Sequence, residues 1–305
     1  MTDAVLSSAS YRTAPRRRSP FRRKAFPYLL VGPAVLYLLA ITLYPGIYAL
    51  YRSFYGGKFK LEWAGLANYS QLFTDYEFFN ALWNTAFLGA ITLLVEFFLA
   101  MLLAALVYRD PWVKGFRIIF LLPMLLMPSA VTFIWKLMFN DGRIISDLLK
   151  RIGLIDFNID WMFTPALARL VVIFTDVWQW TPFLFIIFVA GLQGQDKEVE
   201  EAARLDGASW WSTFFNVSLP MMRPIIAVAL ILRGIDILNM FTPIQLITHG
   251  APGGATETVS YYINRVAWDG PDFGYASAIS VVVLIITVVL AQVLVRRYFK
   301  SGTES

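Results

Sequence analysis

Six long apolar runs constrain the fold of this chain more than any other feature. They lie at about 26–50, 82–107, 118–139, 166–192, 224–248 and 275–295. Each is close to the ~20 residues that a helix needs to cross a bilayer. Only 15% of the residues are charged, whereas soluble globular chains average about 25%. We therefore expect an all-α, polytopic membrane protein with six transmembrane helices.

Basic residues predict the orientation of these spans, because Lys and Arg collect on the cytoplasmic side of membrane proteins. With the N-terminus inside, cytoplasmic segments hold 16 of the 26 basic residues and external loops hold seven. Residues 1–25 are polar and rich in Arg, unlike a signal peptide with its short apolar core. We expect both termini to be cytoplasmic. The basic N-terminal segment predicts contact with anionic lipid and not with nucleic acid.

The sequence lacks the residues for several kinds of site. It has no Cys and a single His, His249, which excludes thiol catalysis and cysteine metal sites. A histidine cluster or a Ser/His relay would depend on His249 alone, which lies in a Gly-rich loop and is expected to be solvated. No GxxxxGK[ST] motif occurs, so ATP is not a ligand of this chain by the P-loop route. We predict neither catalytic residues nor a metal site.

The loop between the fourth and fifth runs differs from the others. It begins with an acidic helical pattern at Asp196, turns at Gly207 and continues as an amphipathic stretch that contains Trp210 and Phe214. We expect Pro220 to end that stretch. Two short helices joined at a glycine, on the cytoplasmic membrane face, would present a compact charged surface to a cytoplasmic partner.

This loop resembles the EAA loop of binding-protein-dependent ABC transporter permeases. In that family Glu-Ala-Ala is followed by three residues, Gly, nine residues and Ile-x-Leu-Pro. The matching residues are Glu201, Ala202, Ala203, Gly207, Val217, Leu219 and Pro220. Asp206 begins a DGAS sequence similar to that of carbohydrate-type permeases, and GLANYSQLF, WQWTPF and FGYASAIS also look like this subfamily. The resemblance covers roughly residues 28–296.

The resemblance implies a fold and a domain plan. The fold would be that of a type I ABC importer permease with a MetI-like core, in a bacterial inner membrane. The segments would be a basic N-terminal tail (1–25), a first transmembrane helix with its external loop (26–81), a permease core (82–296) that includes the coupling loop 193–223, and a cytoplasmic C-terminus (297–305).

The resemblance also implies partners and roles. The family pairs such a permease with a second permease subunit, two copies of a cytoplasmic ATPase and an external solute-binding protein. The ATPase would bind ATP and magnesium, so this chain would carry no cofactor and would not be an enzyme. The solute would be a sugar, glycoside or related polyol. The ATPase-coupling residues would be Glu201, Ala202, Ala203, Asp206, Gly207, Leu219 and Pro220, with Glu201 placed for charge-assisted pairing.

Ionisable residues inside spans are functional candidates, since each costs about 2.5–3.5 kcal/mol on insertion scales. Arg233 and Asp236 are three residues apart on one helix face. They either pair with each other or bind a hydroxyl or anionic group of the substrate. Asp176, Gln179 and Trp180 share a second face and combine a carboxylate, an amide and a ring, which suits a polyhydroxylated ring.

With Ser129, these five residues form the predicted substrate path. The alternative is that they serve helix packing alone. Glu96 is expected to pair within the helix bundle, and the apolar stems of Lys136 and Arg169 allow them to reach the external surface.

Two other classes of function stay open at this point. An ion-coupled secondary transporter or channel is the main alternative, although it has no need for an EAA helix pair. A membrane-embedded enzyme would need a metal or nucleophile constellation, which the sequence does not show. The charge of the substrate also stays open, because Arg233 either faces an anion or is neutralised by Asp236.

Overall fold

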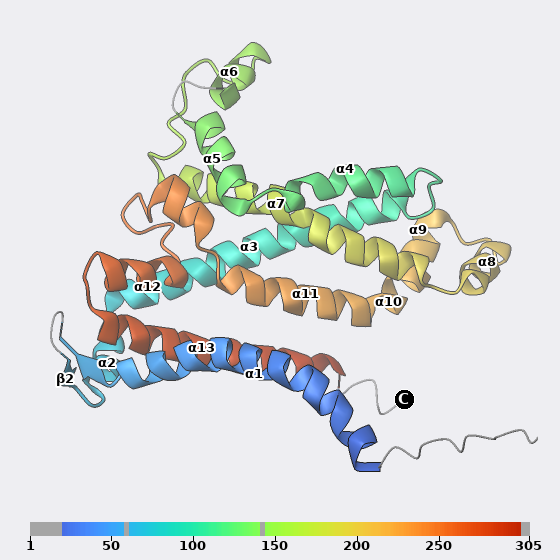
Figure 1. The fold of residues 1–305 in the computed structure, drawn as a ribbon. Helices are drawn as coiled ribbons and strands as arrows, with labels where there is room; N and C mark the ends of the chain where they lie inside the picture. The colour runs from blue at the N-terminus through green and yellow to red at the C-terminus, as the bar shows by residue number, and fades with distance from the viewer. Residues whose placement is uncertain (1–19, 58–60, 141–143, 300–305) are drawn as a thin grey trace, which may run out of the picture. The chain divides into compact units, whose positions relative to one another are not determined.

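The structure is a computed structural model that describes residues 20–57, 61–140 and 144–299 (Figure 1). The chain forms two compact units, Met1–Ala49 and Leu50–Ser305. The first contains most of helix α1 (Pro20–Arg52). This helix begins within the predicted N-terminal tail, and the arginines of that tail before Pro20 lie outside the described residues. The segment Leu30–Arg52 is long and apolar enough to cross a bilayer.

The second unit is almost entirely helical. A two-residue antiparallel ladder joins β1 (Tyr55–Gly56) to β2 (Glu62–Trp63). The α-helices are α2 (Ala67–Leu72), α3 (Tyr76–Val107), α4 (Val113–Leu125), α5 (Pro128–Phe139), α6 (Ile144–Arg151), α7 (Pro165–Gln193), α8 (Lys197–Leu205), α9 (Trp210–Thr213), α10 (Leu219–Met221), α11 (Arg223–Leu238), α12 (Val259–Trp268) and α13 (Phe273–Phe299). Two π-helical turns, η1 (Phe214–Ser218) and η2 (Ile244–Thr248), interrupt this series.

Helices α3 and α7 lie side by side at the centre of this unit (Figure 1). Small residues of α3, Ala100 and Ala104, are buried in one cluster with Phe185 and Phe188 of α7. The same cluster includes Ala229 of α11. Small side chains let helix backbones approach closely in a membrane, where packing replaces the hydrophobic driving force. This packing fixes the positions of the polar side chains that α3, α7 and α11 carry.

The third predicted span is broken, which corrects the expectation of one helix over 118–139. Helices α4 and α5 meet at 86°, and Leu126 and Met127 between them have extended backbone angles. Met127 precedes Pro128, and the proline ring disfavours a helical conformation for the preceding residue. Pro123 and Pro182, in contrast, lie inside α4 and α7 without ending them.

The fifth predicted span, 224–248, is also not one helix. Helix α11 ends at Leu238, and η2 begins only after Pro243. Thr258 donates to the carbonyl of Met240 at 2.8 Å, which satisfies a backbone group that the break exposes. At its other end α11 meets the segment Trp210–Met221 at 65°. Pro220 does not end that segment as expected, because it occupies the first turn of α10, where a missing N–H is tolerated.

Within the described residues, four helices are long and apolar enough to span a membrane. They are the segment Leu30–Arg52 of α1, Tyr76–Val107, Pro165–Gln193 and Phe273–Arg297. The two bent pairs raise this number to six if each pair forms one span. The chain is therefore a multi-pass membrane protein with up to six spans, two of them bent.

Candidate functional site

A cluster of charged side chains lies where α3, α7 and α11 meet. The guanidinium of Arg233 donates to both carboxylate oxygens of Glu96, from Nε at 2.9 Å and from Nη2 at 2.8 Å. It also donates to Asp176 and to Asp236. The side chain of Arg233 is 2% exposed and that of Glu96 is fully buried. Buried charges are stable only when they are paired and hydrogen-bonded, and here three helices supply the partners.

Glycine at position 89 permits this meeting of helices. A Cβ atom there would lie 2.6 Å from Cγ2 of Ile237, so a larger residue would force Ile237 or the helix that carries it to shift. Ile237 lies one turn beyond Arg233 on α11, and Glu96 lies two turns beyond Gly89 on α3. The close contact at Gly89 therefore holds Arg233 within reach of Glu96.

A small hollow of about 140 Å³ opens beside the cluster. Asp176, Gln179, Trp180, Arg233 and Asp236 all contribute to its lining. The guanidinium carbon of Arg233 lies 5.2 Å from the ring centroid of Trp180, within cation–π range. Gln179 Nε2 donates to the carbonyl of Leu126, at 3.3 Å, in the break between α4 and α5.

The structure thus brings together five of the six residues of the predicted substrate path. Ser129 adjoins Pro128 of the lining but is not itself part of it. Asn239 also lines the hollow and was not predicted, because its position depends on the turn that ends α11. Glu96 pairs within the bundle as expected. The role of this hollow in transport stays a prediction.

The predicted coupling loop forms two helices joined at Gly207. After α8, the N–H of Gly207 bonds to the carbonyl of Arg204 and the N–H of Ala208 bonds to that of Ala203, both at 3.0 Å. This pair of bonds is a Schellman motif, which needs a left-handed residue after the helix. Gly207 supplies it with φ +83°. Ser209 then caps α9 by accepting from the N–H of Ser212.

Two adjacent glutamates of α8 have opposite surroundings. Glu200 accepts from the hydroxyls of Tyr108 and Ser218, at 3.2 and 3.1 Å, and pairs with Arg109. Burial and the Glu200 carboxylate raise the pKa of Tyr108 to about 12, so the phenol keeps its proton and donates it to Glu200. Glu201 is exposed. Glu200 therefore attaches α8 to the end of α3, and Glu201 is available to a partner.

An apolar side chain beside Glu201 is also exposed. Leu205 is 90% exposed at the last turn of α8, and Ala202 lies on the same face, three residues earlier. Glu201, Ala202 and Leu205 form a small surface, here called the α8 face. The EAA pattern indicates Glu201 and Ala202 but does not include Leu205, which only the orientation of the helix reveals.

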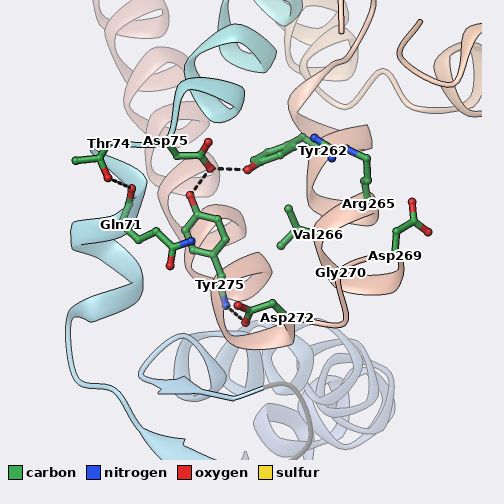
Figure 2. A pocket seen from close by; sticks show the side chains of 10 residues that line it. All are labelled: Gln71, Thr74, Asp75, Tyr262, Arg265, Val266, Asp269, Gly270, Asp272 and Tyr275. Atoms are coloured by element: carbon green, nitrogen blue, oxygen red, sulfur yellow. Dashed lines mark hydrogen bonds between the residues drawn. The ribbon is translucent and has the colours of Figure 1, made fainter. Parts of the chain in front are cut away.

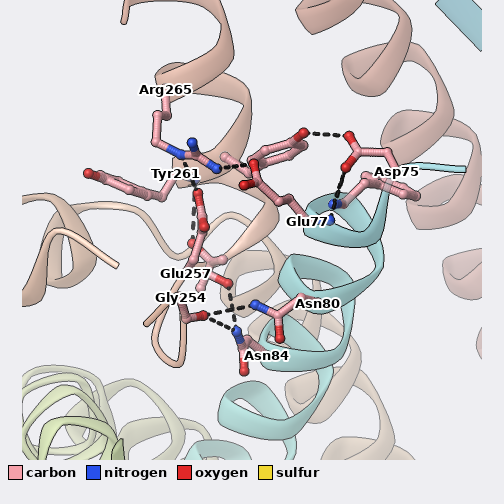
Figure 3. A network of polar contacts seen from close by, with 11 residues as sticks. Asp75, Glu77, Asn80, Asn84, Gly254, Glu257, Tyr261 and Arg265 are labelled. Atoms are coloured by element: carbon pink, nitrogen blue, oxygen red, sulfur yellow. Dashed lines mark hydrogen bonds and ion pairs between the residues drawn. The ribbon is translucent and has the colours of Figure 1, made fainter. Parts of the chain in front are cut away.

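At the opposite end of α3, a polar network ties the loop after η2 to α3 (Figure 3). Asn84 donates to the carbonyls of Gly254 and Glu257, at 2.7 and 3.2 Å, and Asn80 donates to Gly254 at 3.0 Å. Arg265 of α12 pairs with Glu257 at 2.8 Å and with Glu77 of α3 at 2.7 Å. These contacts fix the loop and α12 against the first turns of α3.

Lys136 and Arg169 bind η2 and the loop that follows it, contacts that the sequence did not indicate. Lys136 donates to the carbonyl of Leu246 in η2 at 2.6 Å. Arg169 donates to the carbonyl of Ala255 at 2.9 Å and to Asn84 Oδ1 at 3.2 Å. Both side chains are therefore bound to the protein itself.

An open polar cavity lies between α2, α12 and the starts of α3 and α13, and Figure 2 shows the side chains that line it. Its volume is about 670 Å³. Asp75 in its wall accepts from the hydroxyls of Tyr262 and Tyr275. Burial alone would raise the pKa of Asp75, but these two bonds and those from the N–H groups of Phe78 and Glu77 lower it below the ordinary value. Asp75 is therefore held in its ionised form.

Comparison with known proteins gives consistent matches over most of the chain. Residues 96–300 match the family described as "Binding-protein-dependent transport system inner membrane component". The sulfoquinovosyl glycerol transport system permease protein SmoG of Agrobacterium fabrum is 32% identical, over 88% of each chain. The lactose transport system permease protein LacF of Rhizobium radiobacter is 30% identical, over 87% of this chain and 91% of its own.

A solved structure shares the fold. A chain of a bacterial ABC transporter involved in the import of the acidic polysaccharide alginate superposes with a TM-score of 0.77 at 26% identity. The match covers 92% of the present chain and 98% of the other. The fold and the sequence thus point to the same group of proteins.

Proposed function

The chain belongs to the family of binding-protein-dependent transport system inner membrane components, and on that premise we propose that it is a permease subunit of an ABC importer for a sugar, glycoside or related polyol. Two of its relatives are named as permeases of transport systems for lactose and for sulfoquinovosyl glycerol. The family assigns the chain to transport and not to catalysis. In this proposal the chain forms part of the solute path, and the movement of the partner ATPase is transmitted to its helices and opens that path.

The α8 face is the observation that carries this proposal. The carboxylate of Glu201 forms no ion pair with the described residues and lies beside Leu205, which is 90% exposed. Such a surface is suited to a protein partner, because an apolar anchor buried next to a charge pair gives both affinity and orientation. We propose that the ATPase binds here, with Glu201 paired to a basic group of the ATPase. Gly207 provides the turn that follows α8, and Leu219 and Pro220 belong to α10, which precedes α11.

The remaining partners follow from the same assembly. A second, non-identical permease subunit completes the solute path, and an external solute-binding protein delivers the solute. Two copies of the ATPase hydrolyse ATP and hold the magnesium ion. The ATPase surface is cytoplasmic, so the loop that contains α8 is cytoplasmic, and both termini lie on that side as the basic residues predict.

Contacts within the protein explain how motion at α8 reaches the spans. Glu200 joins α8 to Tyr108 and Arg109 at the end of α3, and Gln195 Nε2 donates to the carbonyl of Ser218 at 2.7 Å. A displacement of α8 therefore acts on α3 directly and on α11 through the segment that contains Ser218. The charged cluster joins these two helices to α7 at membrane depth.

The test uses the intact importer, purified with its ATPase and reconstituted in liposomes. Glu201→Lys should lower ATP-driven uptake at least about ten-fold, because losing one charge pair at an interface costs about 2 kcal/mol or more. Asp156→Lys is the matched control, since Asp156 is exposed and lies outside the coupling loop. ATPase should still co-purify with the control.

Two results would contradict the proposal. Uptake by this chain alone, driven by an ion gradient without ATP, would identify a secondary transporter. Unchanged uptake and unchanged ATPase co-purification in Glu201→Lys would show that the α8 face is not the coupling surface.

A further inference from the structure

We infer that the solute path of this subunit accepts uncharged carbohydrates and rejects phosphorylated, sulfonated and uronic ones, with Asp236 as the residue that sets this selectivity. The inference rests on the proposed importer function and adds the charge of the substrate. It groups this chain with the lactose relative, whose substrate is neutral, and separates it from the sulfoquinovosyl glycerol and alginate transporters, whose substrates are anionic.

The guanidinium of Arg233 is not available to an anion. Arg carries five N–H donors, and four hydrogen bonds from Arg233 go to Glu96, Asp176 and Asp236. Its side chain is 2% exposed, and the ring of Trp180 lies within cation–π range of its guanidinium. A phosphate, sulfonate or carboxylate of a substrate would have to displace a buried carboxylate to reach it.

The charge balance around the hollow is acidic. Arg233 is the one basic residue among the described residues that line it, and three carboxyl groups surround that guanidinium. The cluster therefore carries negative charge unless at least two of the three are protonated. An anionic solute would meet repulsion in the hollow, and like-charge contacts at interfaces are strongly unfavourable.

Asp236 is the member of the cluster that faces outward. Its side chain is 54% exposed, compared with 8% for Asp176 and 0% for Glu96. A carboxylate at membrane depth does not face hydrocarbon, because such groups face a bundle interior or a water-filled path. The exposed face of α11 at Asp236 therefore borders the path between this subunit and the second permease.

The other groups around the hollow suit a neutral sugar. An ionised carboxylate only accepts hydrogen bonds, so Asp236 binds hydroxyl groups and offers nothing to an anionic oxygen. Asn239 and Gln179 add amide groups, and Trp180 adds an aromatic ring. The volume of about 140 Å³ is the share of roughly five water molecules in the liquid. It receives one edge of a sugar, and the second subunit completes the site.

The experiment begins with the partner binding protein and the intact importer. The binding protein is screened by calorimetry against neutral sugars, among them lactose and trehalose, and against uronic, phosphorylated and sulfonated sugars, among them sulfoquinovosyl glycerol. Uptake into liposomes is then measured for each ligand that binds. The wild-type importer should transport a neutral ligand, and an anionic sugar as the better substrate would overturn the inference.

Variants test whether Asp236 sets the selectivity. Asp236→Asn keeps an oxygen that accepts from Arg233 and removes the exposed charge. It should raise uptake of an anionic analogue relative to the neutral ligand by at least about ten-fold, with Asp156→Asn as the matched control. If the ratio of anionic to neutral uptake is unchanged in Asp236→Asn, Asp236 does not set the charge selectivity. If no loaded binding protein stimulates ATP-driven uptake at all, the importer function itself fails, which is a distinct result.

Discussion

Two arginines clamp α3 at two different levels, and they differ mainly in their surroundings. Arg233 of α11 pairs with Glu96 near the middle of α3, and Arg265 of α12 pairs with Glu77 in its first turn. Each guanidinium has at least two carboxylate partners. Each also lies over an aromatic ring, at 5.2 Å for Arg233 and 5.1 Å for Arg265. The two partner glutamates are separated by about 28 Å along the helix, at 1.5 Å per residue.

The two clusters differ in their exposure to solvent. Arg233 is 2% exposed, whereas Arg265 is 34% exposed and its partner Glu77 is 59% exposed. Water and salt screen the Arg265–Glu77 pair, so its net contribution is small, although the second partner of Arg265, Glu257, is only 8% exposed. Water does not reach the inner charges to screen them. Removing one of them therefore leaves its partner buried and unpaired. We therefore expect removal of the arginine to cost more stability at the inner level of α3 than at the outer one.

The largest expected effect comes from removing the inner arginine. Arg233→Leu would leave Glu96 and Asp176 without their cation and cost about 3–5 kcal/mol of stability. Thermal unfolding of the detergent-purified protein, with expression level as a second readout, measures this loss. The triple variant Glu96→Leu, Asp176→Asn, Arg233→Leu should recover most of the lost stability, because packed apolar groups can replace a buried ion cluster. A loss no larger than that of Arg265→Gln would contradict the comparison.

A smaller loss is expected from removing one inner carboxylate. Glu96→Gln keeps one acceptor for the guanidinium and leaves Asp176 and Asp236 to balance its charge. The cost should be about 1–2 kcal/mol, in the range of a hydrogen bond to a charged group, and below that of Arg233→Leu. The same thermal unfolding assay measures it. A loss as large as that of Arg233→Leu would show that Asp176 and Asp236 do not compensate.

The sequence indicates the inner cluster better than the outer one, and the reason is the bilayer. An ionisable residue within an apolar run is conspicuous, so Glu96, Asp176 and Arg233 could all be selected in advance. Arg265 lies in α12, outside the long apolar runs, where a charged residue is not conspicuous. Its contact with Glu77 joins residues 188 positions apart, a distance that local patterns do not bridge.

The coupling loop shows a second limit of sequence-based prediction. Gly207 could be predicted as a turn because its motif is local. The difference between Glu200 and Glu201 could not, since both are glutamates of one helix and only the approach of Tyr108 and Ser218 selects Glu200. The break between α4 and α5 was missed for a related reason. A proline inside an apolar run is compatible with a continuous helix, as at Pro182, or with a break, as at Pro128.

Removing the outer arginine should have a modest, salt-dependent effect. Arg265→Gln would cost within about 1 kcal/mol, the usual range for an exposed pair, and the cost should shrink as salt rises. The measurement is the melting temperature of wild type and variant at low and high ionic strength. Arg233→Leu is the comparison here, since its cost should be nearly independent of salt. A salt-independent loss of several kcal/mol in Arg265→Gln would show that water and ions are excluded from the outer cluster as they are from the inner one.

The smallest expected effect is a pH response at the outer end of α3. The pKa of Asp75 lies below its ordinary value of 3.8, because tyrosine and backbone donors outweigh the cost of burial. A lowered folded-state pKa means that the stabilisation is fully present above pH 3.8 and is lost as the pH falls through the folded value. Asp75→Asn should therefore melt below wild type at neutral pH, by the equivalent of about 0.5 kcal/mol. The gap should close only below pH 3.8, and a gap that closes near neutral pH would mean that another group controls it.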